Sequence, residues 1–97
     1  MFEELHVENN KKLFRFEIAL PSGEYAVLEY RWLKGAMVLM HTLVPKSQQG
    51  KGMGAWLVKN VLEYCSAHHL KIIVYCPFVQ LYIHKHPEYN NLLPPTK

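Results

Sequence analysis

The hydrophobic period of this chain changes near Pro45, and the change limits the folds that the chain can adopt. Before Pro45, apolar and polar residues alternate, as strands with one buried face require. After it, apolar residues recur three and four positions apart, which is the period of a helix. A chain with both patterns is expected to form a mixed α/β structure, with helices packed on a sheet.

Three strands are predicted in the first half of the chain. The first runs from Phe14 to Leu20, where every second residue is apolar. The polar segment Pro21–Glu24 then has the composition of a turn, and a second alternating strand covers residues 26–32. Lys34–Gly35 predicts a tight hairpin. The third strand, residues 36–44, is apolar on both faces and is therefore expected at the centre of the sheet.

The second half of the chain predicts a helix, a strand and a second helix. The first helix is expected to begin near Gly52. A β-branched run at residues 72–76 predicts a buried strand, and the last helix should cover residues 78–84 and end before Pro87. The tail, residues 90–97, is expected to be irregular. The apolar stripe of the first helix consists of Gly54, Leu57, Val58, Val61, Leu62 and Cys65.

This element order, β-β-β-α-β-α, predicts an antiparallel meander that is joined to one parallel strand. The third strand, the helix and the fourth strand form a βαβ unit, which should cross over with a right hand. The chain has 97 residues, so we expect residues 1–97 to form one small domain.

Composition excludes several classes of protein. Hydrophobic residues make up 49% of the chain and charged residues 20%, which argues against disorder. The net charge is +3, without a run of Lys and Arg that would predict nucleic-acid binding. No apolar run approaches the roughly 20 residues of a membrane span, and the N-terminus lacks a signal sequence, so we expect a cytoplasmic protein. The two cysteines lack the spacing of a zinc site.

The segment Gln49-Gly50-Lys51-Gly52-Met53-Gly54 joins a strand end to a helix start. Alternate glycines let the backbone turn sharply and approach a bulky anion, while the helix dipole favours negative charge there. The spacing does not fit a Walker A loop, because Gly52 rather than Ser or Thr follows Lys51. It does not fit a dinucleotide-binding fingerprint either, because Leu57 stands where the third glycine would be. A pyrophosphate is the anion that we expect this glycine segment, residues 49–54, to bind.

Two segments resemble the GNAT superfamily of acetyltransferases. His41–Val44 followed by the glycine segment is similar to its acetyl-CoA loop, and residues 76–89 resemble a minimal subfamily with one small domain. The resemblance covers Tyr25 to Leu93. It implies that acetyl-CoA is the co-substrate, that no metal is needed, and that an amine, either a small molecule or a protein Lys or N-terminus, accepts the acetyl group.

The resemblance also implies roles for particular residues. Backbone groups of Leu43 and Val44 would line the pantetheine arm where the third and fourth strands separate. Tyr82 would protonate the departing thiolate. The pyrophosphate would be held by amides of Gln49, Gly50, Lys51, Gly52, Met53 and Gly54.

The chain departs from larger relatives on the acceptor side. Pro21–Glu24 leave no room for the two helices that shape the acceptor site there, and we expect no counterpart of the two C-terminal strands of larger relatives within residues 90–97. A module that binds acetyl-CoA without turnover, either a sensor or a partner subunit, is therefore the alternative to an enzyme. Weak self-association is left open.

Two further residues are candidates by position. His41 is expected to share a strand face with Leu39 and Leu43, where it is either a base or a core histidine. Cys76 ends a strand just before a helix N-terminus, a position that favours a thiolate, and it either accepts the acetyl group first or is inert packing. His84 and His86 do not face each other on a helix, so no metal site is expected there.

Overall fold

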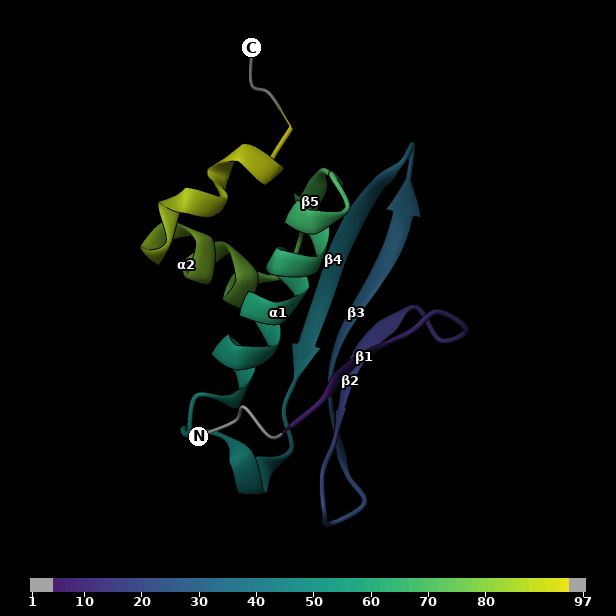
Figure 1. Cartoon of the computed structure of the whole chain (residues 1–97). Coiled ribbons are helices and arrows are strands. Elements are labelled where there is room, and N and C mark those ends of the chain that lie inside the picture. Colours follow the sequence, from purple (N-terminus) through teal and green to yellow (C-terminus); the bar gives the residue numbers. More distant parts are fainter. Residues whose placement is uncertain (1–4, 95–97) are drawn as a thin grey trace.

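The computed structural model describes residues 5–94 and contains a sheet with helices on one side (Figure 1). The elements in chain order are β1 (Val7–Asn10), β2 (Arg15–Ala19), β3 (Tyr25–Leu33), β4 (Ala36–Leu43), the 3-10 helix η1 (Lys46–Gln48), α1 (Met53–Ala67), β5 (Ile72–Val74), α2 (Pro77–Lys85) and the 3-10 helix η2 (Pro87–Leu92).

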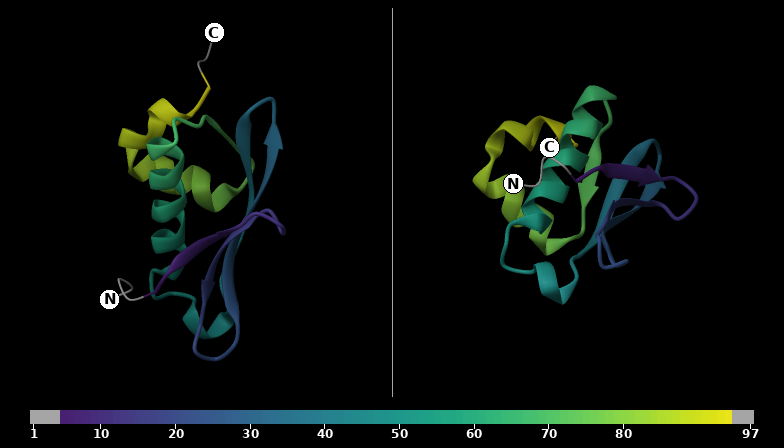
Figure 2. Two further views of the ribbon diagram at one scale, coloured as in Figure 1. Left: turned by 45° about the vertical axis from the view of Figure 1, so that its right-hand side comes forward. Right: turned by 60° about the horizontal axis from the view of Figure 1, so that its bottom comes forward.

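The strands form one five-stranded sheet in the order β1-β2-β3-β4-β5. The strands β1 to β4 pair with one another in antiparallel fashion, and β5 pairs with β4 in parallel, with Met37 opposite Ile72 and Leu39 opposite Val74. Both α1 and α2 lie against the same face of the sheet (Figures 1 and 2). The mixed sheet and the parallel βαβ unit confirm the predicted fold class.

The hairpin between β3 and β4 also has the predicted form. Lys34 and Gly35 both have positive φ angles, 52° and 85°. Two consecutive left-handed residues are what a type I′ turn needs, and this turn matches the twist of the strands that it joins.

The strand β1 was not predicted. It pairs with β2, with Val7 opposite Ile18 and Glu8 opposite Glu17. Only one of its four residues is apolar, so no alternation indicates a strand. It is held by the backbone hydrogen bonds to β2 and by the side chain of Asn9, which accepts a hydrogen bond from the Tyr30 hydroxyl at 2.6 Å.

A β-bulge in β4 corrects the expected position of His41. The register passes from Tyr30 opposite Leu39 to Glu29 opposite His41, so Met40 is an extra residue on β4. Leu39 is buried under the helices, whereas His41 and Leu43 are exposed on the other face. The prediction that His41 shares a face with Leu39 is therefore wrong, because the bulge reverses the alternation.

The C-terminal segment also differs from the prediction. Residues 90–92 belong to η2 instead of an irregular tail, and Leu92 is buried in the core. Lys71 donates a hydrogen bond from its ammonium group to the Asn91 carbonyl at 2.7 Å. Residues 95–97 of the predicted tail lie outside the described part of the chain.

The core lies between the helices and the covered face of the sheet. Residues of the predicted α1 stripe are buried in it, including Leu57, Val61 and Cys65, and so are Leu28 and Leu39 from the sheet. Within residues 5–94, no helix has the length and apolar character that crossing a membrane requires.

Candidate functional site

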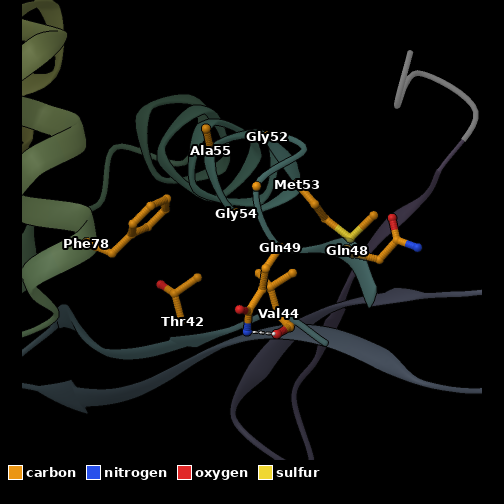
Figure 3. A pocket seen from close by; sticks show the side chains of 10 residues that line it. Thr42, Val44, Gln48, Gln49, Gly52, Met53, Gly54, Ala55 and Phe78 are labelled. Atoms are coloured by element: carbon orange, nitrogen blue, oxygen red, sulfur yellow. Dashed lines mark hydrogen bonds between the residues drawn. The ribbon is translucent and has the colours of Figure 1, made fainter. Parts of the chain in front are cut away.

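A cavity of about 500 Å³ opens between the end of β4, the glycine segment, the first turn of α1 and the start of α2 (Figure 3). Residues from all four of these parts of the chain contribute to its wall. They are Thr42, Val44, Gln48, Gln49, Gly50, Gly52, Met53, Gly54, Ala55 and Phe78.

The cavity exists because β4 and β5 separate. The two strands pair only between residues 37–39 and residues 72–74. Just beyond, the carbonyl of Leu39 accepts hydrogen bonds from the amides of both Tyr75, at 3.0 Å, and Cys76, at 3.2 Å. Past the bulge, β4 continues to pair with β3 on one side, while its other edge has left β5. Thr42 and Val44 there line the cavity.

The loop after β4 folds back on the strand end. The amide of Gln48 donates to the Pro45 carbonyl at 2.8 Å, which closes the turn of η1. The side-chain amide of Gln49 donates to the Val44 carbonyl at 3.0 Å, as the dashed line in Figure 3 shows. This second bond fixes the distance between the strand end and the glycine segment.

Two glycines give the loop its path into α1. Gly50 and Gly52 have φ angles of 79° and 90°, in the left-handed region that disfavours other residues. Gly52 is the N-cap of α1 and provides no side chain to cap the helix. The first backbone bond of the helix runs from the Trp56 amide to the Gly52 carbonyl at 3.0 Å.

The start of α1 is suited to an anion. The first turn has no acidic residue, and no side chain caps it. The amides of Met53, Gly54 and Ala55 precede the first intrahelical donor, so they have no partner within the helix. The positive end of the helix dipole adds to their field.

Phe78 closes the cavity from the α2 side. Its ring points from α2 toward α1 in Figure 3. A Cβ atom on Gly54 would lie 3.0 Å from the Cζ atom of this ring, so the glycine permits the close approach of α2. The sequence prediction placed Gly54 both in the phosphate loop and on the apolar stripe of the first helix, but it did not identify Phe78 as the residue packed against it.

Cys76 lies beside the cavity rather than in its wall. It is the N-cap of α2 and only 4% exposed. Its sulfur lies 3.4 Å from the Thr42 hydroxyl oxygen, and Thr42 lines the cavity. The other cysteine, Cys65, is fully buried, and this burial raises the pKa of its thiol to about 12.

Tyr82 lines a second cavity, of about 270 Å³, on the other side of Phe78. Its ring stacks on that of His86, with centroids 4.2 Å apart. Burial, and then the carboxylates of Glu88 and Glu63, raise the pKa of the Tyr82 hydroxyl. The phenol is protonated at neutral pH, as any tyrosine with a pKa of 10.0 or higher is, and the upward shift makes it a weaker acid than an exposed tyrosine.

His41 lies on the uncovered face of the sheet, opposite Glu29 of β3. It does not line the cavity, and the strand itself separates its side chain from the helices. A role for His41 as a base stays a prediction, and it would require an acceptor that approaches from this uncovered face.

The structure brings together most residues of the predicted cofactor site, and it adds some. Val44 and five residues of the glycine segment line the cavity, whereas Lys51 is exposed outside it and the Leu43 side chain points to the other face. The residues that sequence reasoning missed are Thr42, Gln48, Ala55 and Phe78. Thr42 could not be found, because only the bulge turns it inward. Within residues 5–94, no group of three metal-binding side chains is present.

The profile of a family described as GCN5-related N-acetyl-transferase matches residues 15–92 of this chain. The match includes β2 to β5, the glycine segment and both α-helices. The chain belongs to this family.

Individual relatives agree with this assignment. Protein NATD1 from Danio rerio is 33% identical over 89 residues, which cover 88% of this chain and 81% of the relative. Protein NATD1 from Homo sapiens is 30% identical over 85 residues, which cover 86% and 75%. A GCN5-like protein from Staphylococcus aureus, solved in solution by NMR, superimposes with a TM-score of 0.72 at 25% identity and covers 98% of this chain and 93% of its own.

Proposed function

We propose that this chain binds acetyl-CoA in the cavity of about 500 Å³ and transfers the acetyl group to an amine. The observation that supports the proposal most is the continuity of the cavity. It runs from the start of α1, where three backbone amides have no partner within the helix, to Thr42, which contacts Cys76 where β4 and β5 separate. A long cofactor with phosphates at one end and a thioester at the other matches such a cavity.

The pyrophosphate would lie on the glycine segment. The left-handed Gly50 and Gly52 shape the loop, and the free amides at the start of α1 can donate to phosphate oxygens. Lys51 is exposed next to these glycines and can add a positive charge. Gly54 keeps the approach to the first turn free of a side chain.

The pantetheine arm would follow the edge of β4 that β5 has left. Backbone groups of Leu43 and Val44 can hydrogen-bond to its amides. The Leu43 backbone can make this contact even though the Leu43 side chain points to the uncovered face of the sheet. An amide near Val44 can also polarise the thioester carbonyl.

Acetyl-CoA supplies the acetyl group as a thioester, and the chain must move two protons. The amine nitrogen forms a bond with the carbonyl carbon, and the carbon–sulfur bond breaks. Tyr82 would donate its hydroxyl proton to the departing thiolate, a step that requires the Phe78 side chain between the two cavities to move aside. If the amine approaches from the uncovered face of the sheet, the proton that it loses would pass to His41 through water. In the alternative route the Cys76 sulfur, having lost its proton, forms a bond with the carbonyl carbon and CoA leaves with its sulfur; the amine then takes the acetyl group from Cys76 and regenerates the free thiol.

A binding module without turnover is the second candidate function. Phe78 stands between the cavity and the second cavity that holds Tyr82. On the acceptor side, a tight turn links β2 to β3, closed by the Leu20 amide and the Glu24 carbonyl at 2.9 Å. Both observations favour a protein that holds acetyl-CoA for a partner, as a sensor or a subunit.

The release of free CoA thiol distinguishes the two functions. The protein is incubated with acetyl-CoA and a panel of polyamines, small primary amines and Lys-containing peptides. An enzyme releases thiol faster with at least one acceptor than without, whereas a module binds acetyl-CoA with no acceptor-dependent release. If acetyl-CoA does not raise the melting temperature at all, both functions are wrong.

A further inference from the structure

Two cavities of this molecule share one wall. The first is the cavity described above. The second, of about 270 Å³, lies between α2 and the first turn of α1. Its lining consists of Ala55, Phe78, Leu81, Tyr82, Lys85 and His86, and most of these residues contribute apolar or aromatic surface. Ala55 and Phe78 line both cavities.

The ring of Phe78 is the part of this wall that separates the cavities. Ala55 carries only a methyl group and is fixed in the first turn of α1. Phe78 carries a large ring that extends from α2 to within 3.0 Å of a Cβ position on Gly54. Phe78 is 41% exposed, so removing its ring would join the two spaces without a large loss of core packing.

The second cavity adjoins the thioester end of the first. Phe78 follows Cys76 by two residues on α2, and Cys76 contacts Thr42 at the inner end of the first cavity. A thioester placed there would lie next to the Phe78 ring, with the apolar space behind the ring.

We propose that the second cavity is an acyl pocket that Phe78 closes, and that Phe78 limits the bound acyl group to short chains. The inference rests on the proposed function, since it places an acyl-CoA in the first cavity. The occupant of the opened pocket is an unbranched aliphatic chain, which gains by burying its methylene groups against Leu81 and Tyr82.

The test measures binding of CoA, acetyl-CoA, butyryl-CoA and hexanoyl-CoA by calorimetry in the wild type and in Phe78→Ala. Each buried methylene group contributes about 0.8 kcal/mol, so two of them tighten binding by roughly tenfold. In Phe78→Ala, hexanoyl-CoA should bind at least about tenfold more tightly than acetyl-CoA. In the wild type, the longer chains should bind no more tightly than acetyl-CoA.

Phe14→Ala is the matched control. Phe14 is a phenylalanine with the same exposed fraction, 41%, and it lines neither cavity. It should keep the chain-length profile of the wild type. Phe78→Leu retains an apolar side chain on α2 and should give an intermediate profile, which keeps the test valid if Phe78→Ala unfolds.

Three results would overturn the proposal. The first is a chain-length profile of Phe78→Ala and Phe78→Leu that is parallel to the wild type. The second is an equal gain in affinity of Phe78→Ala for CoA without an acyl group, because the opened space would then receive the nucleotide part of CoA instead of an acyl chain. The third is an absence of binding of CoA and acetyl-CoA to the wild type, which would show that the proposed function itself is wrong. Binding of acetyl-CoA with an unchanged profile leaves that function intact.

Discussion

The hydroxyl oxygen of Thr42 lies 3.4 Å from the sulfur of Cys76. This contact joins the part of β4 beyond the bulge to the N-cap of α2, across the opening between β4 and β5. It places the thiol directly behind the wall of the cavity, although only 4% of Cys76 is exposed.

The first prediction concerns the two thiols. A thiol reagent should modify Cys76 before Cys65, since burial raises the pKa of Cys65 to about 12 and leaves it fully buried. Acetyl-CoA should slow the modification of Cys76. Peptide mass spectrometry over time measures both rates, with Cys76→Ala to identify the signal. Equal rates, or no effect of the cofactor, would make Cys76 a structural residue.

The second prediction concerns the packing of α1 on α2. In a helix, Gly→Ala stabilises by about 0.8–1 kcal/mol, but a Cβ atom on Gly54 would lie 3.0 Å from the Phe78 ring. Gly54→Ala should therefore raise the free energy of unfolding little when Phe78 is present, and it should raise that free energy more when it is combined with Phe78→Ala. Urea unfolding of the four variants gives the coupling energy, and a coupling of zero would show that the ring does not press on Gly54.

The third prediction concerns the hydrogen bond that Tyr89 donates to the Glu63 carboxylate at 2.5 Å. Glu63 is exposed, so Tyr89→Phe should lower the free energy of unfolding by about 1 kcal/mol, which is below the range of about 1.5–3 kcal/mol for hydrogen bonds to charged groups. Tyr75→Phe, at a tyrosine that is 63% exposed, is the control and should change stability by less than about 0.5 kcal/mol.

The same tyrosine makes stability depend on pH. Burial, and then the hydrogen bond to Glu63, raise the pKa of Tyr89 above its ordinary value of 10.0. The folded state thus retains the proton longer than the unfolded state, so this contribution to stability is complete below pH 10.0 and is lost as the pH rises above it. When the pH rises from neutral to alkaline, the free energy of unfolding should fall less in Tyr89→Phe than in the wild type. Equal losses would show that Tyr89 does not cause this pH dependence.

The fourth prediction concerns turnover. If Tyr82 protonates the leaving thiolate, Tyr82→Phe should lower kcat by about 100-fold with any active acceptor. The affinity for acetyl-CoA should stay nearly unchanged, because Tyr82 does not line the cofactor cavity. Steady-state kinetics and calorimetry separate the two effects. An unchanged kcat would leave Tyr82 with a packing role against His86.

Some features could be read from the sequence because they depend on local chemistry. Positive φ angles at Lys34 and Gly35 follow from hairpin geometry, and Gly50 and Gly52 follow from a sharp entry to a helix. The period of the α1 stripe fixed which side of this helix is buried.

Other features depend on tertiary structure and gave no local signal. The extra residue Met40 has no distinctive type, yet it moves His41 to the uncovered face and turns Thr42 into the cavity. The polar β1 is recognisable only through its partner strand. The position of Phe78 between the cavity and Tyr82 depends on the angle at which α2 crosses α1, and a sequence pattern does not specify this angle.

The most direct test of the central claim measures acetyl-CoA binding by calorimetry in Gly52→Asp and Gly23→Asp. Both glycines have φ angles near 90°, so both changes add the same charge and similar backbone strain, but Gly23 lies in the β2–β3 turn. Wild type and Gly23→Asp should bind acetyl-CoA with equal affinity. Gly52→Asp should bind acetyl-CoA at least about 100-fold more weakly, because a carboxylate would face the pyrophosphate. A folded Gly52→Asp variant that binds as tightly as the wild type would contradict the account.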